Sequence, residues 1–255
     1  MKWRLIIDEK PNDAYTNMAI DEAILVEHKV PTLRLYQWNP SAISIGYFQS
    51  LKREVNIDKC KEQGIDIVRR ITGGGAVFHD KELTYSFVCP ENLVSNKIID
   101  SYEKICNTIV YALNKFGLDA KFIPINDIIV NGKKISGNAQ TRRDGIILQH
   151  GTILLDVDVD KMFSLLLVPD EKLKDKIIKN IKERVTSTKD QGIKNIEDLK
   201  NNIIEGFEKE FSIKFEMGNL SENENKLSEK YIQKFSSDEW INKRWLKHPW
   251  SNKGG

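Results

Sequence analysis

Three consecutive glycines follow two arginines in the segment Arg69-Arg70-Ile71-Thr72-Gly73-Gly74-Gly75. Glycine loses more backbone entropy on folding than any other residue, so a triple glycine predicts a loop rather than a helix or strand interior. Such a loop offers unobstructed backbone N–H groups beside fixed positive charge, which are the ingredients of an anion or phosphate site. The residues of this short segment equally allow a flexible hairpin with solvated arginines.

A second candidate is a lysine beside a predicted hairpin. Asn131-Gly132 follows a β-branched run and is a strong signal for a tight turn between two strands, with Lys134 on the returning strand. An isolated lysine at such a place is most simply a solvated side chain. The small residues Ser136, Gly137 and Ala139 that follow instead indicate a surface against which a ligand could lie.

A third candidate is His150, which interrupts a long apolar run together with Gly151. A hydrogen-bonded histidine at a β-bulge and a histidine in a binding site both fit this pattern. The residue types alone leave the two interpretations open.

The elements that must position these residues follow from hydrophobic periodicity. Ile65 to Val68 alternates like a strand and a second apolar run starts at Ala76, so the glycine loop is predicted to join two strands. Further strands are predicted at 3–7, 33–38, 42–47, 83–88, 146–155 and 213–216. Helices are predicted from about 13 to 28, and at 54–63, 98–116, 170–182, 196–211 and 222–235.

Composition sets the broad class. A chain of 255 residues with 40% hydrophobic and 30% charged residues is typical of a globular protein, and no repeat, linker or domain boundary is evident. A net charge of +2 does not indicate nucleic-acid binding. The three cysteines lack metal-site spacing, and no apolar stretch reaches the ~18 residues of a membrane span. We therefore expect a cytoplasmic protein.

The full string from Arg69 to Asp80 resembles the signature of the lipoate-protein ligase family, whose relatives include octanoyltransferases and biotin protein ligases. The resemblance implies the α+β fold of that group, a mixed sheet flanked by helices and similar to class II synthetases. It also implies one catalytic domain over residues 1–255, with the separate C-terminal accessory domain of some relatives absent. The matching segments are 17–23, 69–80, 126–128, 132–137, 150–152 and 184–187.

Members of this family activate a carboxylic acid with ATP and then pass the acyl group to a lysine of a small acceptor domain. The implied cofactors are ATP and Mg²⁺, and the implied acyl substrate is lipoate or octanoate. The acceptor would be a 2-oxoacid dehydrogenase acyltransferase subunit or a protein of the glycine cleavage H type, and a separate accessory subunit is possible. Fixed cations suit this chemistry because a carboxylate and a phosphate repel each other.

The resemblance also assigns residues. Lys134 is the expected catalytic residue, in contact with the acyl carbonyl and the phosphate, and Asp127 is an expected Mg²⁺ ligand. A missing side chain at Gly46 would let a ligand pass close to the backbone. The expected nucleotide site contains Arg70, Gly73, Gly74, Gly75, Ala76, Val77, Phe78, Asn126 and Asp127. The expected acyl site contains Gly46, Arg69, Thr72, His79, Lys134, Gly137 and His150.

The main alternative is an octanoyltransferase, which forms a thioester on a cysteine and consumes no ATP. One branch carries that cysteine in the region that here reads 119–124, and another carries it well after the histidine strand. Cys60, Cys89 and Cys106 all lie upstream of both regions, so the sequence favours the ATP-dependent ligase. The segment 137–142 is similar to some transferases, which keeps that alternative open. A non-catalytic acyl-binding adapter is a third alternative, and the joint presence of Arg70, the glycines and Lys134 argues against it.

Overall fold

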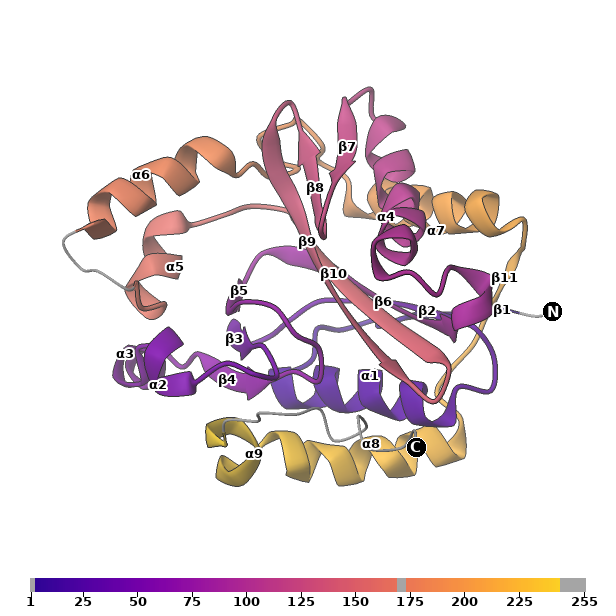
Figure 1. The fold of residues 1–255 in the computed structure, drawn as a ribbon, viewed down its shortest axis with the longest axis horizontal. Helices are drawn as coiled ribbons and strands as arrows, with labels where there is room; N and C mark the ends of the chain where they lie inside the picture. Colours follow the sequence, from indigo (N-terminus) through magenta and orange to yellow (C-terminus); the bar gives the residue numbers. More distant parts are fainter. Residues whose placement is uncertain (1–2, 169–172, 244–255) are drawn as a thin grey trace.

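A mixed eight-stranded sheet forms the centre of the structure, a computed structural model that describes residues 3–168 and 173–243 (Figure 1). The strand order is β11-β1-β2-β6-β10-β9-β8-β7. The pairs β11–β1 and β1–β2 are parallel, and the remaining pairs are antiparallel. The bounds are β1 Trp3–Ile7, β2 Thr32–Tyr36, β6 Glu82–Pro90, β7 Ala120–Ile123, β8 Asp127–Val130, β9 Lys133–Arg143, β10 Ile146–Leu154 and β11 Phe215–Met217.

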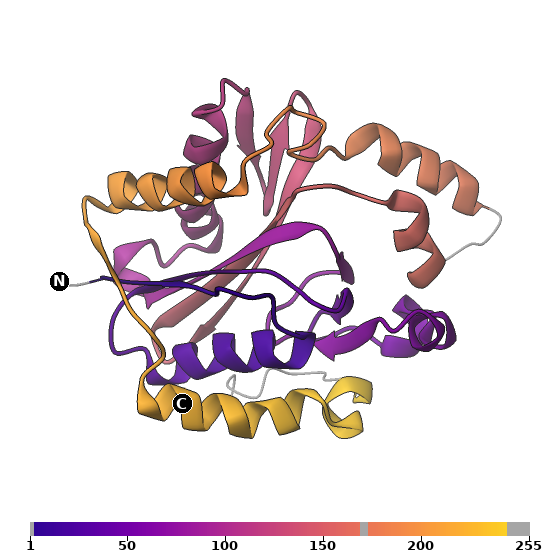
Figure 2. The same ribbon diagram turned by 180° about the vertical axis from the view of Figure 1, so that it is seen from behind.

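Helices cover both faces of this sheet, which confirms the predicted mixed sheet flanked by helices (Figures 1 and 2). The helices α4, Ile98–Asn114, and α7, Ile196–Phe211, pack on one face over a core that includes Phe87 and Phe207. The helix α1, Ala14–Glu27, lies against the other face over a second core, and α8, Glu222–Phe235, packs against α1 (Figure 1). Burying apolar side chains on both faces is the main driving force for this arrangement.

A second sheet carries the glycine loop. It has three strands in the order β4-β3-β5, with β3 at Ala42–Ile45, β4 at Asp66–Arg69 and β5 at Val77–His79. The loop joins β4 to β5, as predicted from the sequence. The remaining elements are α2 Leu51–Glu54, α3 Ile57–Glu62, η1 Glu91–Leu93, α5 Val159–Leu165, α6 Lys174–Arg184 and α9 Asp238–Asn242.

Two predicted elements differ from the structure. The single helix predicted over 54–63 is wrong: Val55 is extended and buried, and Asn56 caps a new helix, α3, by accepting from the Lys59 N–H. The predicted interruption of the strand at His150-Gly151 is also wrong, since β10 pairs continuously with both neighbours there. The first residues of the helix predicted over 170–182 lie outside the described residues.

Strand β2 places a charged side chain, that of Arg34, in the protein interior. Arg34 is fully buried, and its guanidinium contacts Asp8 at 2.6 Å and Asp21 at 2.9 Å. It also donates to the side-chain oxygen of Asn17 on α1 at 2.8 Å. A buried ion pair of this kind adds little net stability, but loss of one partner leaves an uncompensated charge. Arg34 therefore fixes α1, and Asp21 with it, against the central sheet.

Within the described ranges, no helix is both long and apolar enough to cross a bilayer.

Replacing Arg34 with methionine should lower the free energy of unfolding by about 3–5 kcal/mol, because Asp21 and Asp8 lose their buried partner. Urea unfolding followed by circular dichroism at pH 7 measures the change. Arg53→Met, at an exposed position of α2, is the matched control and should stay within about 0.5 kcal/mol of the unsubstituted protein. Equal stability of the two variants would show that the buried cation is dispensable.

Candidate active site

A cavity of about 530 Å³ lies where the glycine loop, the strands β9 and β10 and the helix α5 approach one another. This volume is in the range of small-molecule sites. Its apolar lining includes Trp38, Phe78, Met162 and Phe163, and Lys134 supplies a positive charge. The cavity can therefore hold a chain of methylene groups and place a polar end beside a cation.

The structure brings most of the predicted site residues to this cavity. The predicted residues that line it are Arg70, Gly74, Gly75, Ala76, Val77, Phe78, His79, Asn126, Lys134, Gly137 and His150. Five predicted residues lie outside the lining as the described residues define it: Gly46, Arg69, Thr72, Gly73 and Asp127.

The Arg70 side chain holds the backbone of the glycine loop through hydrogen bonds. Its guanidinium is buried, and one terminal nitrogen donates to the carbonyl oxygens of Gly73 and Gly75, both at 2.7 Å. The other terminal nitrogen donates to the backbone and hydroxyl oxygens of Ser44, and Nε donates to the Thr72 hydroxyl. Burial lowers the pKa of Arg70 to about 10, so it remains a cation at neutral pH. All five donors of the side chain thus have acceptors, and Arg70 shapes the loop.

Gly46 and Arg69 tie the loop to its surroundings. A Cβ atom on Gly46 would overlap the carbonyl oxygen of Gly74, so the missing side chain admits the loop backbone rather than a ligand. The Arg69 guanidinium is fully buried and donates to carbonyl oxygens, among them those of Tyr47 at 2.9 Å and Ile241 at 2.7 Å. Packing and backbone contacts thus engage both residues within the protein, and their contact with an acyl substrate stays a prediction.

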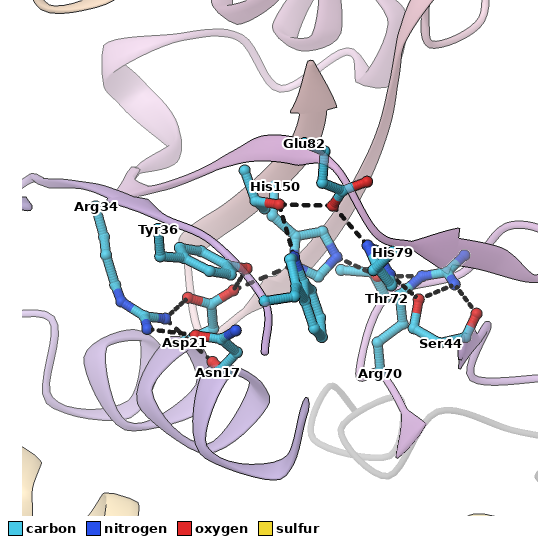
Figure 3. A network of polar contacts seen from close by, with 12 residues as sticks. Asn17, Asp21, Arg34, Tyr36, Ser44, Arg70, Thr72, His79, Glu82 and His150 are labelled. Atoms are coloured by element: carbon cyan, nitrogen blue, oxygen red, sulfur yellow. Dashed lines mark hydrogen bonds and ion pairs between the residues drawn. The ribbon is translucent and has the colours of Figure 1, made fainter. Parts of the chain in front are cut away.

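Each of two histidines lies between a carboxylate and a hydroxyl (Figure 3). His79 contacts the Ser44 hydroxyl through Nε2 and Glu82 through Nδ1, both at 2.7 Å. Its ring stacks on Trp38 with 3.9 Å between ring centroids. These contacts fix the plane of the ring at the cavity wall, and they leave its nitrogens no hydrogen-bonding capacity for a ligand.

His150 forms the second arrangement. Its Nε2 lies 2.8 Å from the Thr72 hydroxyl, and its Nδ1 lies 3.2 Å from Asp21, which Arg34 also contacts. Burial lowers the pKa of His150 more than the nearby Asp21 raises it, so the ring is neutral at pH 7. For Asp21, burial raises the pKa, but the hydrogen bond to His150 and the charge of Arg34 outweigh it and leave the pKa below its ordinary value.

Sequence reasoning did not select several residues of this network. Ser44 and Trp38 hold His79 from segments far upstream in the sequence, and Glu82 holds it from three residues downstream. Asp21 lies in the matching segment 17–23, which was the only available signal for it. Contacts between distant strands leave no periodic pattern in the sequence.

Lys134 lines the cavity, and its ammonium group forms an ion pair. Its Nζ lies 2.7 Å from an Asp127 oxygen, and both side chains are partly exposed. Across the described ranges, no group of three or more His, Cys, Asp and Glu residues is arranged to hold a metal ion. The partner of Asp127 in this structure is the Lys134 ammonium group.

The cysteines lie away from the cavity. Cys60, Cys89 and Cys106 are all buried and free, and each falls outside the cavity lining formed by the described residues. Burial raises the pKa of the Cys60 thiol to about 11 and those of Cys89 and Cys106 to about 12. Thiolate nucleophiles need the opposite environment, partly exposed and electropositive.

Comparison with known proteins now identifies the family. A family model described as the lipoyl protein ligase A/B catalytic domain matches residues 13–208. The chain belongs to this family. Curated relatives in the family include Octanoyltransferase LipM of Clostridioides difficile, 37% identical over 95% of this chain and 99% of the relative. Octanoyltransferase LipM of Bacillus subtilis is 35% identical over 95% of this chain and 98% of that protein.

Solved structures of lipoyl ligases share the fold. The bipartite lipoate protein ligase of Thermoplasma acidophilum superposes with a TM-score of 0.90 at 35% identity, covering 97% of this chain and 98% of the other. A lipoate-protein ligase A with bound ATP superposes with a TM-score of 0.83 at 31% identity, covering 94% of this chain and 98% of the other. The chain therefore shares the architecture of these ligases.

The expectation of an ATP-dependent ligase reaction is wrong. The curated relatives that match this chain over nearly their whole length are octanoyltransferases. The expected cofactors, ATP and Mg²⁺, are corrected with it, as are the nucleotide role of the loop and the metal role of Asp127. The error has a physical origin, because the loop and fold that indicated a ligase also support acyl transfer. The position of a cysteine was not sufficient to separate the two reactions.

Gly46→Ala should lower the free energy of unfolding by about 1–3 kcal/mol, because the added methyl group overlaps the Gly74 carbonyl oxygen. Gly73→Ala, in the glycine loop itself, is the matched control, since a Cβ atom there meets no atom within 4 Å. Thermal unfolding of both variants measures the difference. If Gly46→Ala is as stable as Gly73→Ala, the loop does not need this close approach.

Proposed function

We propose that this protein is an octanoyltransferase, which moves a medium-chain acyl group from a carrier-bound thioester to a lysine of a lipoyl acceptor domain without ATP. The observation that carries the proposal is the 35–37% identity to Octanoyltransferase LipM over more than nine-tenths of both chains. The cavity supports it, because an apolar enclosure with a cation at its wall suits an acyl chain and its carbonyl group.

The reaction needs no nucleotide because a thioester is already activated. The neutral amine of the acceptor lysine attacks the carbonyl carbon, the C–N bond forms and negative charge develops on the carbonyl oxygen. The C–S bond then breaks, and the departing sulfur takes up the proton that the amine loses. Lys134 would stabilise the negative charge on the carbonyl oxygen. A fixed cation lowers the barrier of the step in which that charge develops.

The acyl group passes directly from donor to acceptor in this proposal. A cysteine intermediate would require a thiol in the cavity with a lowered pKa. The three thiols of the chain are buried, have raised pKa values and lie away from the lining. Donor and acceptor must then be bound at the same time.

The proposed acceptor is a lipoyl domain of the 2-oxoacid dehydrogenase or glycine cleavage H type. The structural relative from Thermoplasma acidophilum was described together with its E2 lipoyl domain. Free thiols suit a reducing compartment, so a cytoplasmic location is part of the proposal.

The purified protein should octanoylate a lipoyl domain when it is given octanoyl-carrier thioester and no ATP. Intact-mass spectrometry of the acceptor measures the transfer. Lys134→Ala should lower the rate by about 10²–10³, the usual cost of removing a group that stabilises an oxyanion. Modification that requires free acid and ATP would contradict the proposal, and the absence of any transfer would favour an acyl-binding adapter.

A variant with all three cysteines replaced by alanine should keep its transfer rate within about threefold, because no thiol of this chain takes part in a direct transfer. Circular dichroism checks that the variant folds, and each single replacement serves where the triple variant is unstable. Loss of transfer in a folded variant, together with an acylated cysteine in the unsubstituted protein, would establish a covalent intermediate instead.

A further inference from the structure

The hairpin of β8 and β9 contains an irregularity that turns Lys134 toward Asp127. Asp127 pairs with Gly137 and Ile128 pairs with Ser136, but Ile129 pairs with Lys134, so one extra residue, Ile135, lies in β9. In a regular strand, two residues three positions apart point to opposite faces. The extra residue brings Lys134 and Gly137 to the same face as Asp127.

Gly137 leaves room for the lysine on that face. A Cβ atom at this position would lie 3.2 Å from both Cε and Nζ of Lys134. That distance is shorter than ordinary van der Waals contact, so a larger residue would displace the ammonium group. Gly137 therefore gives the lysine side chain its place beside Asp127.

The backbone on either side of the ion pair is held in place. The Lys134 carbonyl oxygen accepts from the Thr186 N–H at 2.9 Å, beside an isolated bridge between Lys134 and Val185. Asn138 donates from its side chain to the Asn126 carbonyl oxygen at 2.9 Å, just before Asp127. The segment 184–187, whose role the sequence did not explain, thus supports the lysine.

The ion pair itself faces two environments. Lys134 and Gly137 line the cavity, whereas Asp127 lies outside the lining defined by the described residues. Nζ and the carboxylate oxygen are 2.7 Å apart, and both side chains are more than one-third exposed, so the pair adds little to stability. The carboxylate thus holds the ammonium group from outside the cavity.

From this geometry we infer that Asp127 is a positioning residue that holds the Lys134 ammonium toward the acyl carbonyl through an ion pair built by the β9 irregularity and Gly137. The inference rests on the proposed function for its catalytic meaning. Asp127 touches neither substrate nor the reacting atoms, and it acts only through the lysine.

Two measurements on Asp127→Asn test the inference. The first is the acetylation rate of Lys134 by limiting acetic anhydride, mapped by mass spectrometry with Lys133 as internal reference. An ion-paired ammonium reacts more slowly than a free one, so the rate should rise severalfold. The second is octanoyl transfer, in which kcat should fall about tenfold while KM for the acyl carrier changes less than about twofold.

Asp127→Glu should recover part of the rate because it restores the carboxylate. Asp119→Asn is the matched control, since it removes the carboxylate of another exposed pair, with Lys121 at 2.8 Å, and should alter neither measurement. Unchanged acetylation of Lys134 in Asp127→Asn would overturn the inference whatever the activity. Faster acetylation in a protein that never transfers octanoyl would leave the ion pair standing and refute the proposed function.

Discussion

The buried guanidinium of Arg70 connects the glycine loop with the contacts of both histidines. Its donors hold the carbonyl oxygens of Gly73 and Gly75 in the glycine loop. The same side chain binds the hydroxyls of Ser44 and Thr72, which lead to the two histidines. A cation with all its donors engaged is stable in this position because each hydrogen bond offsets part of its desolvation. The loop is thus ordered by polar contacts, and its glycines give the backbone the freedom to make them.

The polar side chains that hold the two histidines form one continuous network (Figure 3). It runs from Arg34 through Asp21 and His150 to Thr72 and then to Arg70. Removal of one member leaves its neighbours buried without partners, so such networks rigidify what they contact. The network therefore gives one part of the cavity lining a rigid polar support, and Lys134 lines the same cavity outside this network.

The fold does not select between ATP-dependent ligation and ATP-independent transfer. Both reactions need an apolar cavity for the acyl chain, and this chain combines such a cavity with the architecture of solved lipoate-protein ligases. In a ligase the leaving group is a nucleotide, and in a transferase it is a thiol. The difference lies in the donor that approaches the cavity, which is why the motifs indicated the family correctly and the reaction wrongly.

Local signals in the sequence were sufficient for most elements. The glycine loop between two strands, the Asn131-Gly132 turn and the amphipathic helices follow from backbone freedom and periodicity, which act over a few residues. The family resemblance located Lys134 and the cavity-lining loop residues. Lys134 and the loop residues could be located because the family motifs consist of residue types at fixed spacing, which can be read from one sequence.

Other features required the three-dimensional structure. The break at Val55, the unbroken pairing of His150, the space that Gly46 leaves for Gly74 and the ion pair of Lys134 with Asp127 all arise between segments that meet only after folding. Arg69 and Arg70 are neighbours in the sequence, yet one is tied to the carbonyls of the 46–49 segment and of α9 while the other shapes the loop beside the cavity. Burial and hydrogen-bond partners set those roles, because a guanidinium away from water must find acceptors where the tertiary fold provides them.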